Sequence, residues 1–205
     1  MKFPPVTFWS NLRAKEVATA LAACQKGQNF MAACVTAESG LTYVALSGEP
    51  STALLDALEG QLSFKGLQPE AKLSGKKRKQ LKGDERKRAE AVRNLPGIGG
   101  GTYVIVRDAF SLNNRMMDPD RAQVQSRVGT ADNPLEFGGN RNCAEPKALQ
   151  AAGTAGERVN GMTTIWFGSR NNDYPDPANP VPGISTAVPC GFCQTNEERI
   201  MRNAF

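Results

Sequence analysis

The chain of 205 residues contains no histidine, so any metal site must use its cysteines or its acidic side chains. It has only five cysteines, an odd number, and three of them stand in short motifs. A disulfide framework explains such a set poorly, because disulfides use cysteines in pairs. We therefore expect reduced thiols that bind a metal.

Long apolar segments are also absent. No run reaches the length of about 20 residues that crosses a bilayer, and the opening residues MKFPPVTFWSNLRAKE have early prolines and no apolar core of signal-peptide type. We expect a soluble protein with no signal peptide and no membrane partner, acting in a reducing cytoplasm. The content of 40% hydrophobic and 22% charged residues is typical of globular proteins, and we expect one domain over 1–205.

Positive charge is concentrated in one segment. Eleven basic and four acidic residues lie between Lys65 and Arg93, so this segment accounts for the formal net charge of +5. We call 65–100, which ends in a glycine run, the basic insert. Such a run is either a solvated face, a surface for an acidic protein, or a track for nucleic-acid phosphates. The candidate phosphate contacts are Lys76, Lys77, Arg78, Lys79 and Lys82.

Hydrophobic periodicity and turn residues predict alternating helices and strands. Ser10 is the expected N-cap of the first helix, and a glycine in the 38–40 connection indicates a β-hairpin. Residues 111–142 and the proline-rich stretch 171–189 are expected to be loops. The predicted helices cover 10–26, a short segment after Ser51, 84–94, 143–152 (ended by Gly153) and 190–203, and the predicted strands cover 29–37, 41–48, 102–108 and 162–169. The fold class is α/β.

Two cysteine motifs carry the chemistry. Cys143 begins Cys-Ala-Glu, and Cys190 and Cys193 form Pro-Cys-Gly-Phe-Cys; both motifs open predicted helices, whose free N–H groups and dipole favour thiolates. Three thiolates leave one corner of a zinc tetrahedron open to water, and zinc lowers the pKa of bound water to about 7. Glu145 lies two residues after Cys143, where it can move protons at that water.

These residues resemble a known family. The pair of motifs is similar to the C/H-x-E and P-C-x-x-C signature of the zinc nucleobase deaminases, in the cytidine-deaminase superfamily. The strings NRNCAEPKAL and VPCGFCQ resemble the bacterial polymorphic-toxin deaminases, especially the YwqJ-like group. The resemblance implies a three-layer α/β/α sandwich around a mixed sheet of about four or five strands.

The same resemblance implies an activity and its residues. Zn²⁺ is held by Cys143, Cys190 and Cys193, Glu145 is catalytic, and the backbone N–H of Ala144 meets the base carbonyl. The further substrate-binding candidates are Asn140, Tyr174 and Phe192, the last two as surfaces for stacking on a base.

The expected reaction is conversion of cytosine to uracil in nucleic acid, single-stranded DNA or RNA rather than duplex. The Asn-x-Glu-Asn pattern that holds a ribose in free cytidine deaminases is missing before Cys143, where the sequence reads FGGNRN. The family further implies a toxin delivered into a target cell and a cognate immunity protein as partner.

Other interpretations stay open from the sequence. Cys190 and Cys193 could be a redox pair or part of a structural zinc site closed by Cys24 or Cys34, although both of these lie in apolar periodic segments where a buried, inert cysteine is usual. Glu145 could simply stabilise a helix N-terminus. The alternative functions are deamination of a free nucleoside, nucleotide or base, and a binding module with structural zinc.

Overall fold

The computed structural model describes residues 1–24, 29–63, 103–107 and 143–205. In these ranges, five strands form one mixed sheet in the order β3-β2-β1-β4-β5. β1 is antiparallel to both β2 and β4, β5 is antiparallel to β4, and β3 is parallel to β2. The strands are β1 (Phe30–Ala37), β2 (Thr42–Leu46), β3 (Tyr103–Ile105), β4 (Val159–Phe167) and β5 (Ser185–Ala187).

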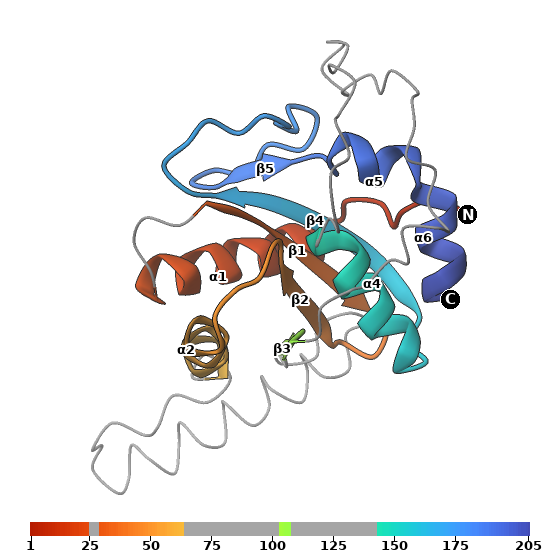
Figure 1. Cartoon of the computed structure of the whole chain (residues 1–205), viewed down its shortest axis with the longest axis horizontal. Helices are drawn as coiled ribbons and strands as arrows, with labels where there is room; N and C mark the ends of the chain where they lie inside the picture. Colours follow the sequence, from red (N-terminus) through yellow and green to blue (C-terminus); the bar gives the residue numbers. More distant parts are fainter. Residues whose placement is uncertain (25–28, 64–102, 108–142) are drawn as a thin grey trace, which may run out of the picture.

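Helices cover both faces of this sheet (Figure 1). α1 and α2 lie on one face, whereas α4, α5 and α6 lie on the other. Their bounds are α1 (Phe8–Cys24), α2 (Thr52–Ser63), α4 (Ala144–Thr154), α5 (Gly191–Thr195) and α6 (Glu197–Ala204). The predicted α/β class, with helices on both faces of a five-stranded mixed sheet, is confirmed.

Most local predictions agree with the structure. The 38–40 connection closes the hairpin of β1 and β2, and Gly40 there has φ of 89°, a conformation that glycine adopts at little cost. Ser51 caps α2, since its Oγ accepts a hydrogen bond from the Leu54 N–H at 3.3 Å.

The first helix begins earlier than predicted. Thr7, and not Ser10, is the N-cap: the Thr7 Oγ1 accepts from the Ser10 N–H at 3.1 Å, and the Ser10 Oγ accepts from the Thr7 N–H at 2.9 Å. This reciprocal pair is a capping box in which serine takes the third helical position. Two hydroxyl residues three apart are both plausible caps, and the sequence pattern did not separate them.

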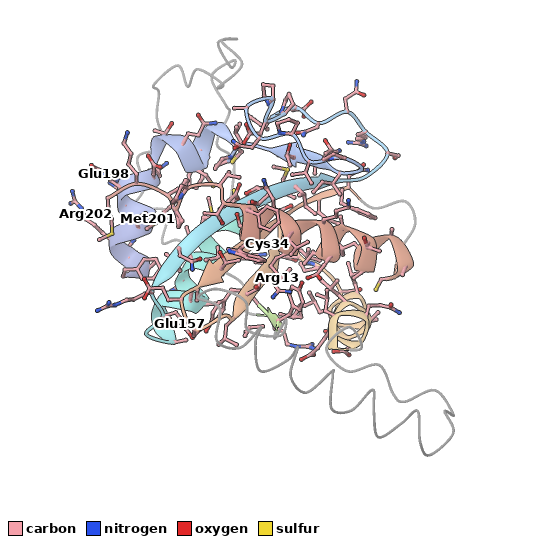
Figure 2. All side chains as sticks on the ribbon, turned by 180° about the vertical axis from the view of Figure 1, so that it is seen from behind. Arg13, Cys34, Glu157, Glu198, Met201 and Arg202 are labelled. Carbon is pink, nitrogen blue, oxygen red and sulfur yellow. The ribbon has the colours of Figure 1, made fainter. Side chains whose placement is uncertain are left out.

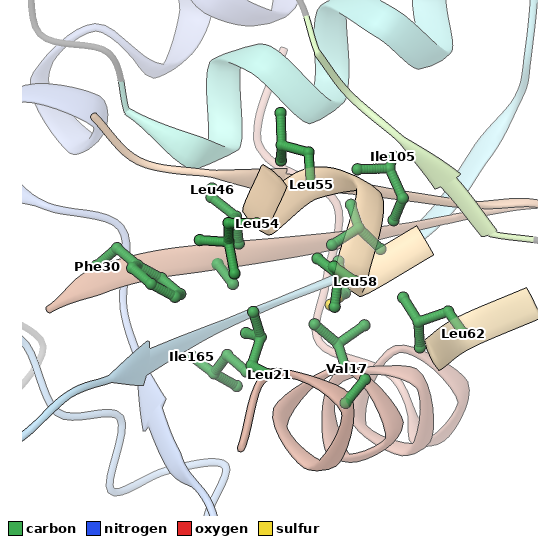
Figure 3. Close-up of a cluster of buried hydrophobic side chains, with 14 of the residues drawn as sticks. Val17, Leu21, Phe30, Leu46, Leu54, Leu55, Leu58, Leu62, Ile105 and Ile165 are labelled. Atoms are coloured by element: carbon green, nitrogen blue, oxygen red, sulfur yellow. The ribbon is translucent and has the colours of Figure 1, made fainter. Parts of the chain in front are cut away.

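The face under α1 and α2 has an apolar core (Figure 3). Val17 and Leu21 of α1 meet Leu58 and Leu62 of α2 above Ile165 of β4. An ion pair borders this core, in which Nη1 of the buried Arg13 lies 2.9 Å from Oε2 of the half-buried Glu16, and Tyr103 also donates to Glu16. These contacts fasten β3 to α1.

Gly153 does not end α4 as predicted. It lies inside the helix, where an added Cβ would stand 1.6 Å from the Ala204 carbonyl oxygen, so glycine allows α6 to pack against α4. The helix ends at Thr154, with Ala155 as its C-cap. Gly156 follows with φ of 73°, and the Glu157 N–H donates to the Ala152 carbonyl across the turn.

The C-terminal third differs from the prediction in two places. The proline-rich stretch 171–189 contains a strand, β5, which pairs with β4. The expected single helix over 190–203 is two helices, α5 and α6, separated at Asn196 (φ −102°, ψ 14°). The buried Asn196 amide donates to the Phe192 carbonyl at 3.0 Å and stabilises the break.

The strand predicted over 102–108 is shortened to β3 and takes the sheet edge beside β2. The basic insert, the 84–94 helix and the 111–142 loop lie outside the described residues. Within the part of the chain that is described, no helix combines the length and apolar character needed to cross a membrane.

Candidate metal centre

Two helix N-termini bring the three motif cysteines together. Cys143 is the N-cap of α4, Cys190 is the N-cap of α5, and Cys193 lies within α5. Both N-cap residues have extended backbone, with ψ of 148° and 163°, and neither side chain bonds its own helix. Their sulfurs therefore lie close together where the two helices begin.

The three sulfurs form a compact triangle. Cys143 Sγ lies 3.6 Å from Cys190 Sγ, and all three sulfurs lie within 4.8 Å of one another. Cys193 is fully buried, while Cys143 and Cys190 are half-buried. This group could bind a metal ion, and its two half-buried members leave one side of the site accessible.

Burial and crowding raise the pKa of the cluster thiols. The pKa of Cys143 is raised chiefly by its contact with Cys190, and the pKa of Cys193 is raised chiefly by burial. Neighbouring thiolates repel one another, so the thiolate form needs a compensating positive charge. A cation between the sulfurs supplies that charge, and for this reason metal binding releases protons from such clusters.

Glu145 lies beside this cluster in the first turn of α4. It is 1% exposed, and its Oε2 accepts a hydrogen bond from Cys193 Sγ at 3.8 Å. Burial is the main cause that raises the Glu145 pKa to about 8, with the Cys190 charge adding to it. Its Oε1 is buried without a hydrogen-bond partner among the described residues. An orphaned carboxyl oxygen beside three thiols is the donor arrangement of a site built for a further ligand.

No fourth side-chain ligand joins this group within the described ranges. Cys34, which the sequence left open as a closing ligand, is fully buried in the apolar core on the opposite face of the sheet. Cys24 packs against that same core. Figure 2 labels Cys34 of β1 and Arg13 of α1, the helix that covers this face. Cys34 thus has the buried role that its apolar context indicated, whereas Cys24 is half-buried at the edge of the same core.

Lys147 is a neighbour of the site that the sequence reasoning missed. Its Nζ donates to the Leu46 carbonyl at 2.9 Å and to the Gly48 carbonyl at 2.7 Å, and burial lowers its pKa. These bonds fix the first turns of α4 to the end of β2 and so position Glu145. A second charged residue two positions after Glu145, in the mostly apolar run Ala144 to Leu149, was the available signal.

A cavity of about 370 Å³ lies next to the cluster, and no sequence pattern predicted it. Its lining includes the N-terminal segment 3–6, Met162 and Thr164 of β4, and Pro189, which directly precedes Cys190. Thr164 is the link to Glu145, whose pKa it lowers slightly. The Thr164 Oγ1 is itself buried without a partner among the described residues.

The predicted substrate residues have different positions. Ala144 is the first residue of α4 and is fully buried, next to both Cys143 and Glu145. Tyr174 is half-buried beside β5, where its carbonyl accepts from the Val188 N–H at 2.9 Å. Phe192 is 8% exposed and packs within the core under α5, and its stacking on a base stays a prediction. Asn140 and the five basic residues 76–79 and 82 lie outside the described ranges.

Comparison with known proteins adds no family to this picture: no protein-family model, curated protein or solved structure matches the chain. The function is therefore inferred from the geometry of the site and from the sequence motifs.

Proposed function

We propose that the chain is a zinc-dependent hydrolytic deaminase that converts cytosine to uracil in nucleic acid. The observation that carries this proposal is the meeting of three cysteine sulfurs with a buried carboxyl that has an unpartnered oxygen. A closed structural zinc site uses four side chains, whereas a catalytic site keeps one position for water or substrate. Three sulfurs and an adjacent proton carrier fit the second kind.

The donor set suits zinc. Zinc–sulfur bonds of about 2.3 Å in a tetrahedron place the sulfurs roughly 3.8 Å apart. The Cys143–Cys190 separation of 3.6 Å is close to this value. Thiolates favour zinc, copper(I) and iron–sulfur clusters over hard cations such as magnesium. When bound, zinc supplies acidification of water at its open position and polarisation of the reacting group.

The chain's own residues provide orientation and proton transfer. Glu145 Oε1 can take one proton from the attacking water and deliver it to the ring nitrogen. It can then carry the second proton, from the added hydroxyl, to the leaving amine, so that the water oxygen becomes the carbonyl oxygen and ammonia leaves. The other carboxyl oxygen, Oε2, lies 3.8 Å from Cys193 Sγ, so Oε1 is the oxygen left without a partner among the described residues. Ala144 at the first helical position presents an N–H without an intrahelical partner to the base carbonyl. Burial excludes bulk water from these transfers.

Support for nucleic acid as the substrate comes from the sequence. The basic insert suits a phosphate backbone, and the motif contexts resemble toxin deaminases. A base that reacts in such a site must be single-stranded or flipped out of its stack. On this proposal, an immunity protein with acidic surface would cover the mouth of the site or the basic insert.

The direct test treats single-stranded and double-stranded DNA and RNA with the purified protein and sequences the products, with free cytidine assayed in parallel. We expect C-to-T or C-to-U changes in single strands, abolished by Glu145→Ala. Conversion of cytidine alone would replace this proposal with a free-nucleoside deaminase. If Glu145→Ala leaves every cellular phenotype intact, the fold is a binding module.

A further inference from the structure

The cavity beside the cluster has a lining that restricts what it can hold. Three of its lining side chains are polar, namely Thr164, Asp176 and Asn179, and the others are apolar. None of the described residues that line it carries a positive charge. A phosphate in this cavity would face the Asp176 carboxylate without a compensating cation, which is unfavourable in a partly buried space.

Asp176 is held as a hydrogen-bond acceptor. It is 5% exposed, its Oδ1 accepts from the Ala178 N–H at 3.2 Å, and its Oδ2 accepts from the Asn179 amide at 2.9 Å. A carboxylate offers about four acceptor positions, so these two bonds leave capacity for a ligand. The Thr164 hydroxyl adds a second buried polar group without a partner in the described residues.

The opposite wall is apolar and anchored. The segment 3–6 contributes Phe3 and Pro5; the Phe3 N–H donates to Glu197 Oε1 at 2.7 Å, and the Pro5 carbonyl accepts from the Met162 N–H at 3.0 Å. A flat or puckered ring can pack on such a wall. The volume of about 370 Å³ is at the small end of ligand pockets, so it suits a single ring system and not a strand of nucleic acid.

We infer that this cavity binds an uncharged, hydrogen-bond-donating ring of the substrate, with the Asp176 carboxylate as its acceptor and Thr164 as the polar link to the reacting centre. The inference rests on the proposed function, since Thr164 and Pro189 place the cavity next to Glu145 and Cys190. Two sources share this chemistry: the sugar hydroxyls of the reacting nucleotide, and the exocyclic amine of a neighbouring base. Phosphates stay outside the cavity in either case.

The test measures ligand affinity by calorimetry on zinc-loaded protein carrying Glu145→Gln, so that no turnover occurs. The first pair of probes is cytidine and 2′,3′-dideoxycytidine. The second pair is single-stranded trinucleotides with adenine or unsubstituted purine next to the target cytosine, because sugar-linked purine has no exocyclic amine and no ring N–H. Each probe is measured with Asp176 intact, with Asp176→Asn, and with Asp173→Asn, an exposed acidic residue of the same loop, as the matched control.

Asp176→Asn keeps an oxygen that can accept from the Ala178 N–H but removes the negative charge. We therefore expect about tenfold weaker binding of one donor-bearing probe, either cytidine or the adenine trinucleotide. The probe of the same pair that lacks the donor should bind equally well with Asp176 intact and with Asp176→Asn. The control substitution Asp173→Asn should not change the affinity of either probe. Loss confined to cytidine identifies the sugar, and loss confined to the adenine trinucleotide identifies the base. Equal effects on both probes of each pair, or no binding with Asp176 intact, would overturn the inference.

The binding and activity results separate the two proposals. If the wild-type protein deaminates but Asp176→Asn has no selective effect on binding, the proposed function stands and the cavity inference is wrong. Selective binding by protein that never deaminates any probe retains the cavity and refutes the deaminase.

Discussion

On the face of the sheet covered by α1 and α2, the buried Arg13 is paired with Glu16. On the face covered by α4, α5 and α6, Glu145 is equally buried, yet one of its oxygens has no partner among the described residues. Leaving a buried polar group unsatisfied costs about 1–3 kcal/mol. Among the described residues, the first face also holds one unpartnered hydroxyl, Thr42 Oγ1, but its buried charge is paired. In the same part of the chain, the second face leaves an oxygen of a buried carboxyl unpartnered where a site is expected.

The largest contrast should come from the buried carboxyl itself. Glu145→Gln preserves the shape of the side chain but cannot carry the proton, so we expect deamination to fall by roughly 10²–10⁴-fold. Thermal stability should not decrease, because the substitution removes a buried ionisable group. Steady-state kinetics and a thermal melt measure the two effects. The control is Glu198→Gln, an exposed glutamate on α6 (Figure 2), and comparable activity in both variants would contradict the assignment.

Truncation of a core side chain on the face covered by α1 and α2 should lower the stability of the protein. Leu58→Ala removes a side chain that is 0% exposed between α2 and α1, so we expect about 2–5 kcal/mol lower free energy of unfolding (Figure 3). The folded protein should keep its metal and its turnover per active site. Urea denaturation measures the loss, with Leu12→Ala as control because Leu12 is 38% exposed on α1. Similar losses in both variants would show that the α1 and α2 face is not packed as described.

The contact between α4 and α6 offers a smaller, matched comparison. Gly153→Ala directs a methyl at the Ala204 carbonyl and should destabilise the protein by about 1–3 kcal/mol. Gly60→Ala in α2 meets nothing within 4 Å and should stabilise it by about 0.5–1 kcal/mol through helix propensity. Denaturant titrations of the two variants measure whether the free energy of unfolding falls or rises in each. A neutral Gly153→Ala would mean that α6 does not pack as closely as described.

The smallest effect tests the orphaned hydroxyl. Thr164→Val replaces a buried Oγ1 that has no partner in the described residues by a methyl of similar shape. We expect the free energy of unfolding of the ligand-free protein to rise by up to about 1 kcal/mol, because an unsatisfied buried polar group is removed. Under the cavity inference, affinity for the donor-bearing probe falls at the same time. A loss of stability would show that the hydroxyl is satisfied in solution.

Local patterns were sufficient for much of this fold. The β1–β2 hairpin and the Ser51 cap follow from residues close together in the sequence, and the Cys-x-Glu and Cys-x-x-Cys spacings identified all three sulfurs of the cluster. A motif fixes both the ligand type and its place at a helix start. These features need no knowledge of distant contacts.

The remaining features depend on contacts between distant segments. β5 exists because three residues of a proline-rich stretch meet β4, and Gly153 is required by α6, about 50 residues away. The cavity combines the N-terminal segment with residues 162–189. No local periodicity encodes such meetings, which explains why Thr164, Asp176 and Lys147 were not predicted.

The central claim is that three sulfurs hold a metal whose fourth position is open. X-ray absorption spectroscopy of the purified protein at the zinc edge, with metal content measured on the same sample, tests it most directly. We expect one zinc per chain with three sulfur ligands and one oxygen or nitrogen, lost in Cys193→Ala and retained in Cys34→Ala. Four sulfur ligands, or protein purified without metal that binds no zinc when zinc is supplied, would contradict the account.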